Sequence, residues 1–195
     1  MAMGNSRRIS LVALFTAIAV VLNSLTVPAP YAGFLLYGVW EIPVLLALLV
    51  LGLWGGVSVA GLNALVLEFV NPGGLPTGPL YNFVAEVSMF MGVMALLRVE
   101  RGRGWGQVAV VAAATLLGAA VRTLVMTLVN FLVLPQPYPI GFGVPEASVP
   151  WLLVLIGAFN LTTALYVVPS AFSVRRAISS RYRYFEGAGR QTFTQ

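Results

Sequence analysis

The stretch QVAVVAAATLLGAAVRTLVMTLVNFLVL, residues 107–134, carries one charged side chain, Arg122, in an otherwise uncharged and mostly apolar run. An α-helix needs about 20 consecutive apolar residues to cross the hydrocarbon layer of a bilayer. Residues 107–134 are therefore predicted to form a transmembrane helix.

The rest of the chain repeats this pattern. Of the 195 residues, 59% are hydrophobic and only 9% are charged, and the mean hydropathy is +0.91, whereas soluble chains are about 25% charged. Clusters of proline and glycine divide the apolar sequence, because proline lacks the backbone N–H that a helix needs. The predicted spans cover residues 9–27, 39–54, 57–71, 79–97, 107–134 and 150–174.

The arginines predict the orientation. All of them except Arg122 lie before the first span, between the fourth and fifth, or after the sixth. With six spans these positions share one side, which the positive-inside rule makes cytoplasmic. We therefore predict an all-α integral membrane protein of the cell membrane. It has one domain over residues 1–195 with six transmembrane helices, and both the basic N-terminus 1–8 and the tail 175–195 are cytoplasmic.

Missing residue types exclude several kinds of membrane enzyme. The chain has no Cys and no His, all 11 basic residues are Arg and all 6 acidic residues are Glu. The usual ligands of haem, iron–sulfur, zinc and copper are therefore absent, as is the lysine of Schiff bases and of the ATP-binding P-loop. We expect no catalytic activity, no metal, no cofactor and no nucleic-acid partner. Energy must come from a partner protein or from a gradient.

Polar side chains inside the predicted spans are the candidates for a binding site, because they are costly in a bilayer and usually face the bundle interior. Most of them fall in the outward half, with aromatic residues nearby, which predicts a pocket for a neutral, flat, polar-edged molecule. The alternative is that the amides only link helices. The set comprises Glu41, Asn63, Glu68, Tyr81, Asn82, Glu86, Arg122, Asn130, Asn160, Thr162 and Thr163.

Arg122 should not face lipid, because an arginine at the centre of a span costs about 2.5–3.5 kcal/mol. Glu86 and Glu68 are the predicted partners for a buried ion pair, with Glu86 favoured. In the first span, Ala13 and Ala17 are four residues apart, and small residues at this spacing let another helix approach closely.

Several stretches, taken in order, resemble the substrate-binding (S) components of energy-coupling-factor (ECF) vitamin transporters of the riboflavin type. The resemblance covers the chain from about residue 10 to residue 172. The stretches are Ala13-Leu-Phe-Thr-Ala17, Glu41-Ile-Pro43, Asn63, Leu75-Pro-Thr-Gly78 with Asn82-Phe83, Met126-Thr-Leu-Val-Asn130-Phe131 leading to Pro135, and Phe159-Asn160.

The resemblance implies a function and two partners. In that family six helices bind the vitamin from outside, under the loop that joins the first two spans. The first helix docks on a membrane coupling protein, the T component, which carries two cytoplasmic ATPases. The resemblance thus implies that Ala13 and Ala17 face the coupling protein. It places Glu41, Asn63, Asn82, Asn130 and Asn160 around riboflavin, the transported ligand.

One departure leaves the exact vitamin open. The family usually has Lys three residues after the Asn of the sixth span, where this chain has Thr163. Arg122 is a hypothetical replacement for the missing cationic donor. The alternatives are an S component for another vitamin or flavin analogue, an ion-coupled carrier with Glu68, Glu86 and Arg122 as a relay, and a structural subunit without a ligand.

Overall fold

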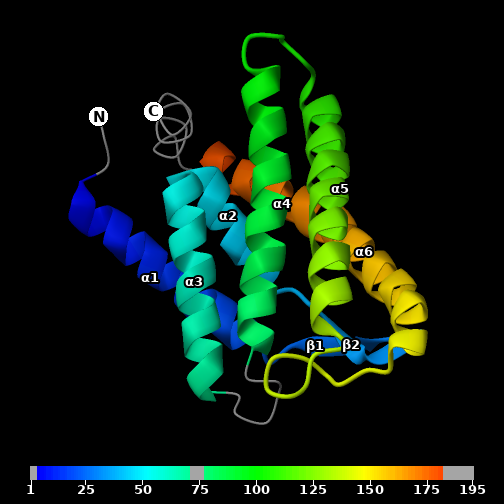
Figure 1. The fold of residues 1–195 in the computed structure, drawn as a ribbon. Coiled ribbons are helices and arrows are strands. Elements are labelled where there is room, and N and C mark those ends of the chain that lie inside the picture. The colour runs from blue at the N-terminus through cyan, green and yellow to red at the C-terminus, as the bar shows by residue number, and fades with distance from the viewer. Residues whose placement is uncertain (1–3, 71–76, 182–195) are drawn as a thin grey trace.

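Residues 4–70 and 77–181 are described by the computed structural model, and they form six α-helices, one β-hairpin and a short 3-10 turn (Figure 1). Each predicted span corresponds to one helix, with ends that differ by several residues, so the helical class is confirmed for these residues. The elements in chain order are α1 (Asn5–Leu22), β1 (Thr26–Ala29), β2 (Ala32–Gly38), α2 (Glu41–Leu51), α3 (Leu53–Val70), α4 (Gly78–Glu100), α5 (Gln107–Val133), η1 (Glu146–Ser148) and α6 (Val149–Arg181).

The lengths of the helices distinguish α2 from the others. Five segments, those of α1, α3, α4, α5 and α6, are long and apolar enough to cross a membrane. The 11 residues of α2 reach roughly 16 Å at about 1.5 Å per residue, about half of the hydrocarbon thickness. Six complete crossings and cytoplasmic termini therefore stay predictions.

The short α2 is the centre of the core. Its residues from Pro43 to Leu51 are all buried, and it packs against α1, α3 and α6. A helix that is apolar on every side is stable only where other helices surround it. The helix ends at Gly52, whose φ of 82° favours glycine because it has no Cβ, and α3 begins at the next residue.

The β-hairpin was not predicted from the sequence, which assigned its residues to a span end and a loop. β1 and β2 pair antiparallel, with Thr26 opposite Gly38 and Val27 opposite Tyr37. Pro28 is compatible with this pairing because each strand of a two-stranded sheet is an edge strand. The hairpin shortens the first span, so that α1 ends at Leu22 instead of residue 27.

The two ends of the bundle differ in charge. Figure 1 places the start of α1, the α4–α5 loop and the end of α6 at one end, with the hairpin at the opposite end. Arg8, Arg98, Arg103 and Arg176 belong to the first of these ends, which we call the arginine-rich end. At the hairpin end, the loop after α5 folds onto the start of α4, where the Thr77 hydroxyl donates to the carbonyls of Pro139 and Ile140, each at 3.1 Å.

Candidate functional site

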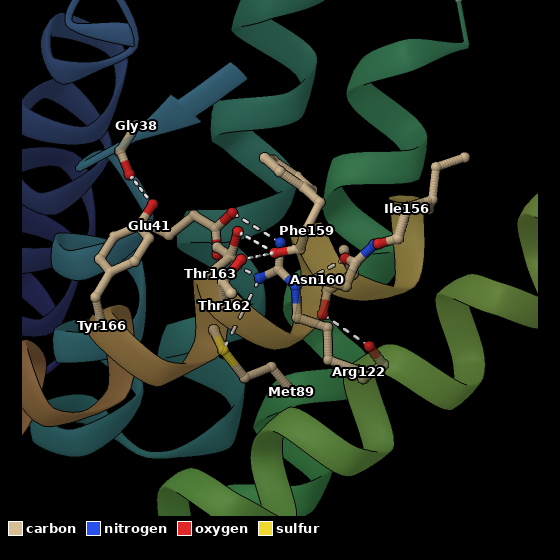
Figure 2. A network of polar contacts seen from close by, with 12 residues as sticks. Gly38, Glu41, Met89, Arg122, Ile156, Phe159, Asn160, Thr162, Thr163 and Tyr166 are labelled. Atoms are coloured by element: carbon tan, nitrogen blue, oxygen red, sulfur yellow. Dashed lines mark hydrogen bonds and ion pairs between the residues drawn. The ribbon is translucent and has the colours of Figure 1, made fainter. Parts of the chain in front are cut away.

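An ion pair between α2 and α5 forms the centre of the candidate site. The guanidinium of Arg122 donates from both terminal nitrogens to the two carboxylate oxygens of Glu41, with Nη2 to Oε1 at 2.8 Å (Figure 2). Their side chains are only 3% and 7% exposed. Bidentate geometry favours such a pair because two parallel hydrogen bonds offset desolvation of both charges. The sequence-based prediction of Glu86 or Glu68 as the partner was wrong.

Glu41 holds this position because of where α2 begins. It is the first residue of the helix, directly after the hairpin, where a carboxylate interacts favourably with the positive end of the helix dipole. Arg122 lies in the middle of α5. The ion pair therefore connects the hairpin end of the core to mid-bundle.

α6 completes the hydrogen bonding of the arginine. The Oδ1 atom of Asn160 accepts from Nε of Arg122 at 3.0 Å, and the Asn160 amide donates to the carbonyl of Ile156 at 2.9 Å. Three helices thus meet at one guanidinium, with the Met89 sulfur of α4 at 3.9 Å from Nη1.

Glu86 is the exception in this polar cluster. Its side chain is 1% exposed, and neither carboxylate oxygen has a hydrogen-bond partner among the described residues. It lies close enough to Glu41 and Arg122 to interact with both electrostatically. Buried polar groups without partners are rare, and each calls for an explanation such as a functional role or a bound water. The site therefore offers two carboxyl oxygens without a hydrogen bond beside the ion pair.

Aromatic side chains from the hairpin and α6 gather at the hairpin end of the candidate site. The rings of Tyr37 and Phe159 have centroids 4.8 Å apart, and those of Tyr37 and Tyr166 are 6.2 Å apart. The Tyr166 hydroxyl donates to the carbonyl of Gly38 at 2.6 Å, and the Tyr37 hydroxyl lies 2.5 Å from that of Thr162. These contacts fix the hairpin to α6.

Tyr31, at the hairpin turn, extends this group of hydroxyls. Its oxygen lies 2.5 Å from that of Tyr37. Desolvation, followed by the hydrogen bond with Tyr37, raises the pKa of Tyr31 above its usual 10.0. The phenol therefore stays protonated at neutral pH and can donate a hydrogen bond.

The remaining predicted residues are placed in different surroundings. Asn63 is buried and accepts from the Asn23 amide at 3.1 Å, and the Asn130 amide donates to the Met126 carbonyl of its own helix at 2.8 Å. The Tyr81 hydroxyl donates to the carbonyl of Ile140 in the outer loop. Each of these three side chains thus has a hydrogen bond inside the protein, and its contact with the ligand stays a prediction.

Other members of the predicted set differ mainly in exposure. Thr163 is buried, and its hydroxyl donates to the Phe159 carbonyl at 2.8 Å. Asn82 and Glu68 are exposed, as are Ala13 and Ala17 of α1. The structure therefore brings Glu41, Arg122, Asn160 and Glu86 together, while Asn82 and Glu68 face outward.

Sequence reasoning missed two members of the site. Met89 lies near the guanidinium and Tyr166 holds the hairpin, but neither was selected as a polar residue within a span. Tyr166 follows Thr162 by four residues, which places both on one face of a helix, and this spacing was the available signal. Met89 has no comparable signal, because thioethers are common in apolar cores.

The donors and acceptors of the site are of the kinds that contact polar organic molecules. No group of three or more acidic residues that could hold a metal ion occurs in the part of the chain that the structure describes. Aromatic faces near the hairpin can stack on a flat ring. The ion pair, the Asn160 amide and Glu86 provide polar contacts below them.

Comparisons with known proteins agree with this architecture. The family model described as "ECF transporter, substrate-specific component" matches residues 7–175. A solved structure, described as the S component of a bacterial ECF transporter, matches with a TM-score of 0.75 and 22% sequence identity, covering 91% of this chain and 98% of that one. At 22% sequence identity, this structural similarity shows only that the two proteins share a fold. No curated protein matches the chain in sequence.

Proposed function

Because the chain belongs to the family of substrate-specific components of ECF transporters, we propose that it binds riboflavin from outside the cell for an ATP-driven importer. The family implies a membrane T component and ATPase subunits as partners. A substrate-specific component is a transporter subunit and not an enzyme. Within the family, the identity of the ligand has to be argued from the site.

The observation that supports a flavin is the position of an aromatic group over a buried polar cluster. Tyr37, Phe159 and Tyr166 lie at the hairpin end, where an isoalloxazine ring could stack by moving the hairpin. The unpartnered oxygens of Glu86 are suitable acceptors for ring N–H or ribityl hydroxyl groups. Riboflavin is neutral, so it requires no further charge beside the Glu41–Arg122 pair.

Arg122 has a changed role in this proposal. Three of its five N–H groups already donate to protein oxygens, so the guanidinium is held by Glu41 and Asn160 and is not free to take the place of the lysine that is absent at Thr163. We propose instead that Arg122 positions Glu41 and Asn160, whose remaining polar atoms then contact the ligand. We therefore favour this positioning role over a direct hydrogen bond from Arg122 to the flavin.

The coupling surface is proposed on α1. Ala13 and Ala17 are exposed, whereas Phe15, Thr16 and Ala19 of the same helix are buried in the core. A face with small residues four apart allows a second helix to pack closely. This exposure supports docking of the T component on α1.

A second vitamin remains a candidate because of Glu86. A buried carboxylate without a partner would also suit a ligand with an amino or cationic group, and Thr163 departs from the riboflavin-type pattern. A cationic vitamin is therefore the competing ligand. Both ligands would lose affinity in Glu86→Gln, so direct titration has to distinguish them.

The test is direct titration of the detergent-purified protein with riboflavin, FMN and a cationic vitamin. Riboflavin should bind with quenching of flavin fluorescence, and the protein should carry yellow colour after expression in riboflavin-rich medium. Ser58→Ala, which removes an exposed hydroxyl that donates to the Trp54 carbonyl of its own helix, is the control and should bind normally. Failure to bind riboflavin by a protein that still binds another vitamin would overturn the flavin assignment.

A further inference from the structure

A groove opens between α5 and α6 at the arginine-rich end of the bundle, about 510 Å³ in volume. Its walls are the first part of α5 and the last part of α6. Toward the hairpin end these helices pack closely, since a Cβ added at Gly157 would lie 3.7 Å from the Thr127 hydroxyl. From there α6 leans away from α5 (Figure 1). The groove is therefore separate from the candidate vitamin site.

The groove has polar residues at one end, and the rest of its lining is mainly apolar. Gln107, Ser173 and Arg176 line it near the arginine-rich end, and Leu116 and Leu165 line it farther inside. Leu116 is 65% exposed and Leu165 is 44% exposed. This apolar surface is open to the bilayer, so a hydrocarbon chain can enter from the side.

The length of the groove matches one leaflet of a membrane. Its lining on α5 begins at Gln107 and ends at Leu116, a rise of roughly 14 Å at about 1.5 Å per residue. Half of the hydrocarbon layer is about 15 Å. An acyl chain that starts at the polar rim would thus reach the inner end of the groove near the middle of the bilayer.

The positive charge at the polar end of the groove indicates which lipid headgroup would bind there. Arg176 is exposed, and no carboxylate pairs with it among the residues that the structure describes. Arginine binds phosphate through its planar fork of N–H donors, and the Gln107 amide adds a donor on the opposite wall. A negatively charged phospholipid complements this rim better than a zwitterionic one.

We propose that the α5–α6 groove is a binding site for an anionic phospholipid. One acyl chain lies between the two helices, and the guanidinium of Arg176 contacts the headgroup phosphate. The site does not depend on the identity of the vitamin. Its lipid would fill a gap in the surface of the bundle and so support the packing of α5 against α6.

Native mass spectrometry of the detergent-purified protein, titrated with phosphatidylglycerol or phosphatidylcholine, tests the proposal. The wild type should retain one phosphatidylglycerol in preference to phosphatidylcholine. Arg176→Gln should reduce that preference about fivefold, the effect of one arginine near an anionic surface. Arg98→Gln, an exposed arginine at the same end but outside the groove, is the control and should keep the preference.

A second pair of variants tests the groove itself. Ala112→Phe places a bulky side chain on a groove residue that is exposed, so it should reduce retention of both lipids, whereas Ala120→Phe, also exposed on α5, should not. Equal retention of the two lipids by the wild type, or unchanged retention in Ala112→Phe, would overturn the proposal. Loss of T-component binding in Ala112→Phe without any retained lipid would instead assign the groove to that partner.

Discussion

At the scale of single residues, the site depends on the arrangement of three ionisable side chains. Arg122 lies beside Glu41 and Glu86, and all three residues are buried. Glu41 takes both terminal nitrogens of the guanidinium. Glu86 is left without a hydrogen bond from the described residues, and the two carboxyl groups therefore have different chemical roles.

The buried ion pair leads to a prediction about the stability of the protein. Arg122→Met leaves Glu41 buried without its partner, and breaking a buried pair in this way costs about 3–5 kcal/mol. The double variant Glu41→Leu with Arg122→Met should recover much of the loss, because no uncompensated charge remains. Thermal unfolding in detergent measures both. If the single variant unfolds like the wild type, the pair contributes little to stability.

Glu86 makes a prediction about binding. Glu86→Gln keeps the shape but replaces one of the two carboxyl oxygens by an amide nitrogen, and a ligand group left without its acceptor costs about 1–3 kcal/mol. Affinity for riboflavin should fall about 5- to 150-fold, as measured by calorimetry, with stability kept or increased. Glu68→Gln is the matched control, since Glu68 is exposed. Unchanged affinity would remove Glu86 from the ligand contacts.

At the scale of elements, the hairpin is held by one helix. Tyr166 of α6 donates to the Gly38 carbonyl at the end of β2, so Tyr166→Phe should loosen residues 26–38. A hydrogen bond of about 0.5–1.5 kcal/mol corresponds to roughly two- to tenfold faster amide exchange there. Hydrogen exchange read by mass spectrometry measures this change. Tyr138→Phe, in an exposed loop, should have no effect on the hairpin.

The exposed face of α1 makes a prediction about coupling. Ala13→Trp or Ala17→Trp should prevent close approach of the T component, because a bulky side chain holds the helices apart. Uptake into cells should fall, while riboflavin still binds the isolated variants. Ala120→Trp, exposed on α5, is the control. Normal uptake in both α1 variants would show that the partner docks elsewhere.

At the scale of the whole molecule, α4 and α5 pack closely enough to fix Glu86 and Met89 beside Arg122. A Cβ added at Gly92 would lie 2.6 Å from the Leu117 carbonyl oxygen and 2.8 Å from the Cα of Gly118. These atoms belong to the backbone of α5, so a side chain cannot be accommodated by rotation alone. The two helices must move apart instead.

The close packing makes a prediction about the fold. Gly92→Ala should destabilise the protein by about 1–3 kcal/mol through overpacking and weaken ligand binding by separating α4 from α5. Gly61→Ala is the matched control, because its Cβ would meet only the Phe83 side chain at 3.7 Å. The control should be neutral or slightly stabilising, since alanine favours helices. Equal unfolding temperatures for both variants would contradict this account.

The sequence by itself determined the class of the fold and most of its segments. Because a bilayer accommodates only chain segments whose backbone groups are hydrogen-bonded internally, membrane helices are long and apolar. Such helices can be recognised from the composition and from the positions of proline and glycine between them. The sequence also singled out Ala13 and Ala17, which are exposed on α1, and their contact with the coupling protein stays a prediction. The candidate set also contained Glu41, Glu86, Arg122 and Asn160, because polar residues are conspicuous in apolar spans.

Only the tertiary structure decided which of these residues meet. Arg122 and Glu41 are 81 positions apart, and no local pattern specifies how α2 and α5 approach each other. The hairpin was missed because its strands are short and their pairing is stabilised by contacts with α6, which lie far away in the sequence. The exposure of Asn82 and the partner of Arg122 depend on helix rotation and packing, which are set by the whole bundle.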